Sequence, residues 1–120
     1  MSTTIILKGE PISTNSVYKS HSKFGHPVIY MTTKGKSLKE SYQWQAKSQW
    51  KKGVKKGEVE LGIFLYFGTK RKCDWDNFHK LSMDALTNIV WADDSQIQRV
   101  VVEKGYDKEN PRIELEVLFT

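Results

Sequence analysis

The chain has 120 residues, of which 38% are apolar and 28% charged, with one cysteine and a formal net charge of +5. This length suits one domain, residues 1–120, with a core that needs no disulfide or zinc to stabilise it. The lone Cys73 excludes a disulfide framework, and no apolar run approaches the roughly 20 residues of a membrane span. The N-terminus shows no basic leader before an apolar segment, so we expect an intracellular, cytoplasmic protein that contacts no membrane.

Charge is divided unevenly along the chain. Residues 1–72 hold 14 Lys and Arg against 4 Asp and Glu, whereas residues 73–120 hold 5 against 10. A basic half is typical of a protein that binds a polyanion such as nucleic acid, and the acidic half is then expected to have another function. Lysines on solvated faces would produce the same imbalance, so charge alone leaves an ordinary soluble protein open.

The N-terminal third is predicted to be mainly strand and loop. Thr3–Lys8 is a β-rich run, and the polar segment Gly9–Ser16 is typical of a loop. Val17–Lys19 and Pro27–Met31 can pair across Gly25 as a hairpin.

A helix is predicted next, because Ser37 and Glu40 have the spacing of a capping box. Four apolar side chains then recur at helical spacing: Leu38, Tyr42, Ala46 and Trp50. The helix should end near Gly53, with Trp44 and Trp50 buried or half-buried.

The C-terminal half alternates between strands and a second helix. The strongest strand signal is the nine-residue alternation Val59–Phe67, and a helix should run from Asp74–Asn77 to about Asn88. Strands are predicted at Ile97–Glu103 and Ile113–Phe119. The fold class is therefore α+β (mixed α/β), with one mixed sheet of about five strands and two helices against it.

The densest chemical signal is the acidic stretch 73–80, followed by Asp93-Asp94. In extended backbone Asp74 and Asp76 point the same way, so both carboxylates can face one point. Asp94 lies just before the strand Ile97–Glu103. If that strand pairs beside Val59–Phe67, Asp94 can reach the same point.

Clustered carboxylates resist ionisation unless a cation joins them, and an all-oxygen set suits Mg²⁺ or Mn²⁺. Such ions promote phosphodiester hydrolysis by clamping the phosphate and lowering the pKa of bound water. Lys80 is the best candidate to offset the charge that develops on the phosphate or the leaving oxygen.

Each of these residues also has an ordinary structural interpretation. One of Asp74 and Asp76 could cap a helix, Lys80 could pair with Asp76 four residues earlier, and Asp93-Asp94-Ser95 could be an Asx turn. EF-hand and zinc spacings fail, and no Gly-rich phosphate loop is present, so we expect no nucleotide cofactor. Trp91 is expected in the core, although stacking on a DNA base would also fit.

Residues 74–103 resemble the RusA family of Holliday-junction resolvases. The resemblance is carried by Asp74-Trp-Asp76-Asn77-Phe-His-Lys80, Asp84-Ala-Leu86 and Asp93-Asp94-Ser-Gln96-Ile97, and more loosely by Pro11-Ile-Ser13-Thr-Asn15. Asn88 is a departure, because many relatives carry Gly there.

The resemblance implies a homodimeric, Mg²⁺-dependent endonuclease that nicks four-way DNA junctions symmetrically and leaves 5′-phosphate and 3′-hydroxyl ends. Mn²⁺ is the expected substitute, and phage or prophage origin fits the family. By position Asp74, Asp76 and Asp94 match its metal-binding acids, Lys80 its essential lysine, and Asp93 is a supporting acid. The expected DNA-binding residues are Lys70, Arg71, Lys72, Asn15 and Asn77.

Three other functions stay open from the sequence. One is a non-catalytic module that binds junction or duplex DNA. Another is a nuclease for other branched or single-stranded DNA. The third is a small interaction protein whose acids only form caps and turns.

Overall fold

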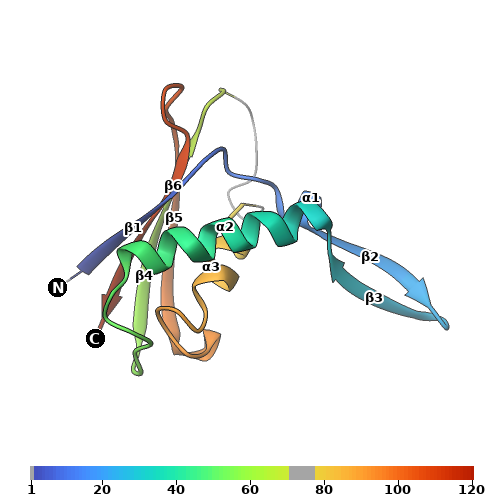
Figure 1. Ribbon diagram of the computed structural model, residues 1–120, viewed down its shortest axis with the longest axis horizontal. Coiled ribbons are helices and arrows are strands. Elements are labelled where there is room, and N and C mark those ends of the chain that lie inside the picture. The colour runs from blue at the N-terminus through green and yellow to red at the C-terminus, as the bar shows by residue number, and fades with distance from the viewer. Residues whose placement is uncertain (1, 71–77) are drawn as a thin grey trace.

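The computed structural model describes residues 2–70 and 78–120 and has an α+β fold (Figure 1). Its strands are β1 (Ser2–Lys8), β2 (Tyr18–Lys23), β3 (His26–Met31), β4 (Val59–Phe67), β5 (Ile97–Tyr106) and β6 (Arg112–Phe119). Its helices are α1 (Thr14–Val17), α2 (Thr33–Gln49) and α3 (Lys80–Leu86), and a 3-10 turn spans Asp94–Gln96. No helix among the described residues is long and apolar enough to cross a membrane.

Four strands form the main sheet in the order β1-β6-β4-β5. Strand β4 runs parallel to β5 and antiparallel to β6, which in turn is antiparallel to β1. The alternation predicted for Val59–Phe67 is confirmed, because every second residue of β4 is buried. Helices α2 and α3 lie over this buried face, and the core fills the space between them and the sheet (Figure 1).

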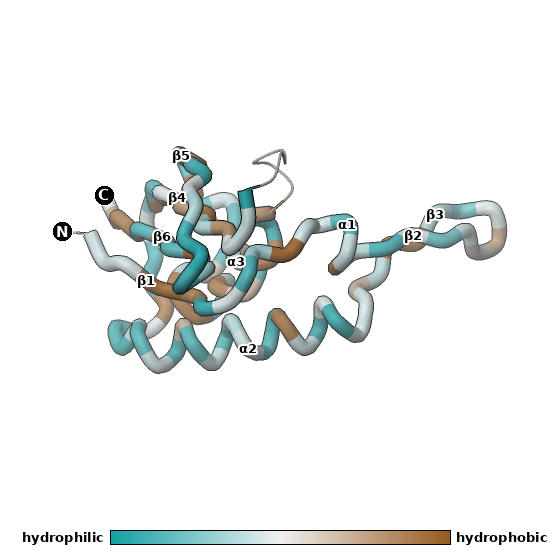
Figure 2. The backbone as a smooth tube through the Cα atoms, turned by 90° about the horizontal axis from the view of Figure 1, so that it is seen from above, coloured by the Kyte–Doolittle hydropathy of each residue, from teal (hydrophilic) through white to brown (hydrophobic). Residues whose placement is uncertain are grey.

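Within the described part of the chain, the other two strands, β2 and β3, pair only with each other and form an arm that projects from the body (Figures 1 and 2). The predicted hairpin is confirmed, with Tyr18 opposite Met31 at its root. The α+β class and the mixed sheet are also confirmed. The sheet has four strands rather than about five because the arm stays separate, and the short helix α1 adds to the two that were expected.

The start of α2 differs from the prediction. The helix begins at Thr33, and its N-cap is Thr32, whose hydroxyl accepts a hydrogen bond of 3.1 Å from the Gly35 amide. Ser37 therefore lies inside the helix, and the predicted capping box is wrong. Strand β3 ends at Met31, so Thr32 caps the helix directly where the arm returns to the body.

The tryptophans of α2 lie in different environments. Trp50, which is 5% exposed, packs in the core as expected, but Trp44 is 75% exposed. Trp44 is two residues from Tyr42, which is 2% exposed and faces the core, so the helical turn directs Trp44 outwards;.

Candidate active site

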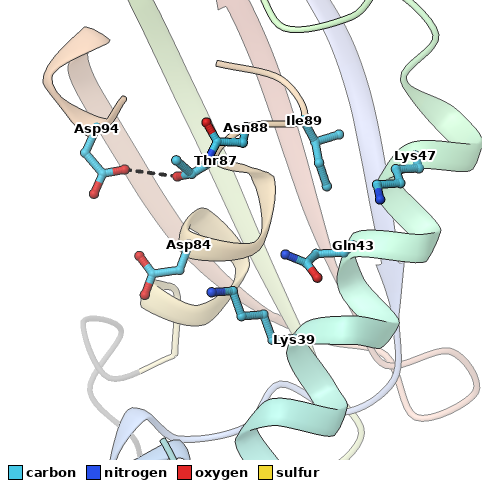
Figure 3. Close-up of a pocket in the computed structure, with 8 residues that line it drawn as sticks. All are labelled: Lys39, Gln43, Lys47, Asp84, Thr87, Asn88, Ile89 and Asp94. Carbon is cyan, nitrogen blue, oxygen red and sulfur yellow. Dashed lines mark hydrogen bonds between the residues drawn. The ribbon is translucent and has the colours of Figure 1, made fainter. Parts of the chain in front are cut away.

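A pocket of about 430 Å³ lies between α2 on one side and α3 with the segment that follows it on the other (Figure 3). Its α2 wall carries three polar side chains spaced four residues apart, Lys39, Gln43 and Lys47;. The opposite wall carries Asp84, Thr87, Asn88, Ile89 and Asp94. Basic groups therefore lie on the α2 side of the pocket and acidic groups on the other, and the Asp84 carboxylate is directed away from α2 (Figure 3).

Asp94 reaches this pocket because of the sheet topology. The condition set in the sequence analysis, that its strand pairs beside Val59–Phe67, is met, because β5 pairs in parallel with β4. Asp94 begins the 3-10 turn that leads into β5, and its Oδ1 accepts a hydrogen bond of 3.2 Å from the Thr87 hydroxyl (Figure 3). One carboxylate oxygen is thus fixed while the residue stays exposed on the pocket wall.

Asp84 is the second carboxylate of the pocket and the centre of a polar cluster. Its Oδ2 accepts a hydrogen bond from the Tyr18 hydroxyl and lies 3.3 Å from the Lys80 amine. That amine is also 5.1 Å from the centroid of the Tyr18 ring. Burial, and then the hydrogen bond to Asp84, raises the pKa of Tyr18 well above its ordinary value, so the hydroxyl keeps its proton at neutral pH;.

Lys80, which the sequence analysis proposes for offsetting charge on the phosphate, belongs to this cluster. Lys80 has an i,i+4 ion pair with Asp84, and its side chain is 54% exposed, so the amine is accessible to a ligand. The alternative partner Asp76 lies outside the described residues. The family resemblance includes Asp84 without giving it a function, and the sequence did not indicate Tyr18 at all, because 66 residues separate Tyr18 from Asp84.

The neighbouring acids Asp93 and Asp94 differ in their surroundings. Asp93 Oδ2 accepts a hydrogen bond of 2.5 Å from the Ser95 hydroxyl, which lowers the pKa of Asp93. The Gln96 side chain accepts from the Asp93 amide at 3.0 Å and ties the turn together. Asp93 therefore belongs to the turn, as the Asx-turn interpretation predicts for this segment, and only Asp94 lines the pocket.

The other candidate residues are dispersed or lie outside the described part of the chain. Asn15 is exposed on α1, and the Lys70 amine lies 5.3 Å from the centroid of the Tyr106 ring at the end of β5. Trp91 is fully buried, which confirms its place in the core. Five candidates lie outside the described residues: Asp74, Asp76, Asn77, Arg71 and Lys72.

The chemistry of the pocket fits a hard cation better than zinc. Among the described residues, its walls offer side-chain oxygens of Asp84, Asp94, Thr87, Gln43 and Asn88, and neither His nor Cys;. Residues 2–70 and 78–120 contain no set of three or more His, Cys, Asp or Glu side chains placed to hold a metal ion. A complete site would therefore also need the acids that the resemblance assigns in the segment before α3.

Comparison with known proteins supplies the family. A search of curated proteins found no match to the chain. The family model for endodeoxyribonuclease RusA matches residues 8–118, nearly the whole chain, a range that includes the motifs between Asp74 and Ile97. The chain belongs to the RusA family of endodeoxyribonucleases.

Proposed function

We propose that this chain is a Mg²⁺-dependent endonuclease that acts as a homodimer and resolves four-way DNA junctions by paired symmetric nicks. The family match over residues 8–118 is the observation that carries the proposal. A twofold dimer would present two equivalent sites to two strands of like polarity, which is what symmetric nicking needs.

The pocket supports a role in phosphodiester hydrolysis. Asp94 would hold the ion together with Asp74 and Asp76, and Mn²⁺ would substitute for it. When bound, Mg²⁺ neutralises the carboxylates and polarises the phosphate for attack by water. Water adds to phosphorus and the P–O3′ bond breaks, which leaves 5′-phosphate and 3′-hydroxyl ends.

The lysines would neutralise the negative charge that accompanies this step. Lys39 and Lys47 point from α2 into the pocket and are placed to contact backbone phosphates (Figure 3). Lys80, whose amine is accessible beside Asp84, would stabilise the charge that develops on the scissile phosphate;. Binding should weaken steeply with salt, because phosphate contacts release counterions.

A nicking assay on a synthetic four-way junction, with and without Mg²⁺, tests this proposal. Asp94→Asn should abolish nicking and retain junction binding, because the amide keeps the shape of the side chain and loses its charge. The matched control is Asp107→Asn, an acid in the turn between β5 and β6, which should nick at the wild-type rate. Normal nicking by Asp94→Asn would exclude Asp94 from the metal site.

The Lys80→Ala variant distinguishes a role of Lys80 in nicking from a role in the stability of the fold. It should slow nicking by about tenfold or more, while thermal stability falls little, because an exposed i,i+4 ion pair contributes only about 0.3–0.5 kcal/mol;. The exposed Lys108 provides the control substitution, Lys108→Ala. A large fall in melting temperature for Lys80→Ala would instead assign Lys80 a structural role.

Substrate comparison separates the remaining functions. A junction resolvase should cut the four-way junction much faster than a flap, a single strand or linear duplex. Equal rates on all branched substrates would indicate a general branched-DNA nuclease. Junction binding without Mg²⁺-dependent cutting would indicate the non-catalytic module.

A further inference from the structure

The β2–β3 arm carries large apolar side chains that are exposed to solvent. Phe24 at its tip is 90% exposed, Ile29 is 74% exposed and Tyr30 is 46% exposed. The arm extends away from the body in both views (Figures 1 and 2). A two-stranded sheet on its own is marginally stable in water, and exposed apolar surface on such an element marks an interaction site.

The two faces of the arm differ in chemistry. Cross-strand pairing places Lys19 opposite Tyr30 and His21 opposite Val28 on one face;. The His21 ring meets the edge of the Tyr30 ring at 5.3 Å on that face. The other face is neutral and includes Ser20 opposite Ile29. One face therefore combines basic groups with aromatic rings, a combination that suits the phosphates and bases of nucleic acid.

Local charge also favours a polyanion. No Asp or Glu occurs from residue 11 to residue 39, a stretch that includes the whole arm, α1 and the first turn of α2. The competing occupant is the uncovered face of the sheet in a second copy of this chain. That face carries Glu60, Glu103, Glu114 and Glu116 together with Lys8, Arg99 and Arg112, so its charge is nearly balanced and attracts the basic arm only weakly. Aromatic rings at the tip and on the basic face favour DNA.

The tip itself has an unusual backbone. Phe24 has φ 53°, in the left-handed region that Asn and Gly adopt far more easily than an aromatic residue;. A large aromatic side chain is thus held outwards at a position where neither backbone preference nor core packing favours it. Proteins that kink DNA insert apolar side chains of this kind between base steps.

The root of the arm connects it to the candidate active site. Tyr18, the first residue of β2, donates its hydroxyl hydrogen to Asp84 on the pocket wall. The Thr32 amide donates to the carbonyl of Val17 at 2.7 Å, and Gly35 of α2 packs closely against the same residue. The arm therefore extends from a fixed root for six residues, about 20 Å. DNA bound in the pocket would continue along the arm.

We propose that the β2–β3 arm is a second DNA contact, in which the basic face follows the backbone and Phe24 inserts into the base stack at a branch point. This rests on the proposed function, because it needs a branched DNA substrate in the pocket. It assigns the preference for branched DNA to the arm and leaves the cutting chemistry to the pocket.

The test uses the full chain without divalent metal, so that binding is separated from cutting. The probe is a synthetic four-way junction with 2-aminopurine at the branch point, and a linear duplex of the same sequence is the comparison. Wild type should raise the 2-aminopurine fluorescence as the base unstacks. Phe24→Asn should lose that rise and bind the junction about tenfold more weakly, within the range for loss of one stacking contact.

Two controls keep the result specific. Phe24→Asn should bind the duplex as tightly as wild type and melt at the same or a higher temperature, because Asn suits the left-handed backbone. Phe24→Trp keeps an aromatic ring and should keep both the fluorescence rise and the junction preference.

Three results would overturn the proposal. In the first, Phe24→Asn matches wild type in junction affinity and fluorescence while wild type still nicks junctions in Mg²⁺, which leaves the proposed function intact. In the second, wild type neither binds nor nicks the junction, and both proposals fail. In the third, sedimentation shows that Phe24→Asn and Tyr30→Ala weaken self-association and leave DNA binding unchanged, which places the arm on a second copy.

Discussion

The strands of the sheet and of the arm are similar in sequence, but the sheet buries its apolar side chains and the arm exposes them. In β4 every second side chain is buried, and Ile63 is 0% exposed. In β3, a strand of comparable apolar content, Ile29 is 74% exposed. The difference is the second layer, because α2 and α3 cover one face of the sheet (Figure 1);. A β-rich sequence therefore predicts a strand, but only a covering layer makes that strand part of a core.

The two regions also differ at their left-handed residues. Asn88, in the crossover between α3 and β5, has φ 71°, and Phe24 at the arm tip has φ 53°. Asn suits this backbone because its short polar side chain tolerates the left-handed conformation, whereas Phe does not. A residue type that suits the left-handed backbone is expected where the fold needs only a turn. A residue type that does not suit this backbone is expected where its side chain is retained for function.

The largest expected effect compares one isoleucine from each region. Ile63→Ala should reduce the free energy of unfolding by about 2–5 kcal/mol, because it leaves a cavity in the central strand. Ile29→Ala should change it by less than about 0.5 kcal/mol, because that side chain is mostly in water;. Urea denaturation of both variants measures the difference. Equal losses would mean that the arm is part of the core.

Local patterns in the sequence predicted much of the fold. The alternation in Val59–Phe67 and the hairpin turn at Gly25 specify their strands within a few residues. The start of α2 was missed because Ser37 and Thr32 are both good N-cap residues, and only the end of β3 decides between them;. The separation of the arm from the sheet was also missed, because strand partners depend on long-range pairing.

The candidate site was predictable where it depends on order along the chain. The position of Asp94 directly before a strand was predicted, but its approach to the pocket depends on the pairing of that strand with β4, which the sequence left as a condition and the structure shows to be parallel. Tyr18 was not predictable, because its contact with Asp84 joins two elements 66 residues apart. The four-residue spacing of Lys39, Gln43 and Lys47 was visible, but the sequence did not show that this stripe lines the same pocket as Asp84 and Asp94.

Gly35→Ala tests how firmly the arm is fixed to the body. A Cβ there would lie 2.6 Å from Val17 Cγ1 and 2.8 Å from the Val17 carbonyl oxygen, so α2 and the root of the arm must separate. We expect a loss of about 1–3 kcal/mol from overpacking, which outweighs the gain of up to about 1 kcal/mol that Ala brings to an open helix position. Calorimetry measures the sign, with exposed Lys36→Ala as the control. A stabilised variant would mean that the root is loosely packed.

Asn88→Ala sharpens the comparison of the left-handed residues. Ala cannot adopt φ 71° without strain, so the variant should lose about 1 kcal/mol, while Asn88→Gly should stay within about 0.5 kcal/mol of wild type;. The same change at the tip, Phe24→Ala, should be nearly neutral because the wild-type residue is already strained there. Thermal unfolding of the three variants provides the ranking. An Asn88→Ala protein as stable as wild type would contradict it.

The smallest expected effect concerns the turn between β5 and β6, which, unlike the arm tip, is held by ion pairs. Arg112 donates to Asp107 at 2.7 Å and to Glu114 at 2.6 Å. The hydrogen bond from Arg112 lowers the pKa of Asp107 below its ordinary value.

A carboxyl group whose pKa is lowered by folding stabilises the folded state at a pH above its unfolded-state pKa of about 4, and that stability is lost as the pH falls through the folded-state pKa. Asp107→Asn should therefore be less stable than wild type at pH 7, and the gap should close below about pH 4. Unfolding curves at both pH values measure this gap, and Glu109→Gln in the same turn should show a smaller one. A gap that persists unchanged at low pH would mean that packing of the turn, rather than the charge of Asp107, stabilises it.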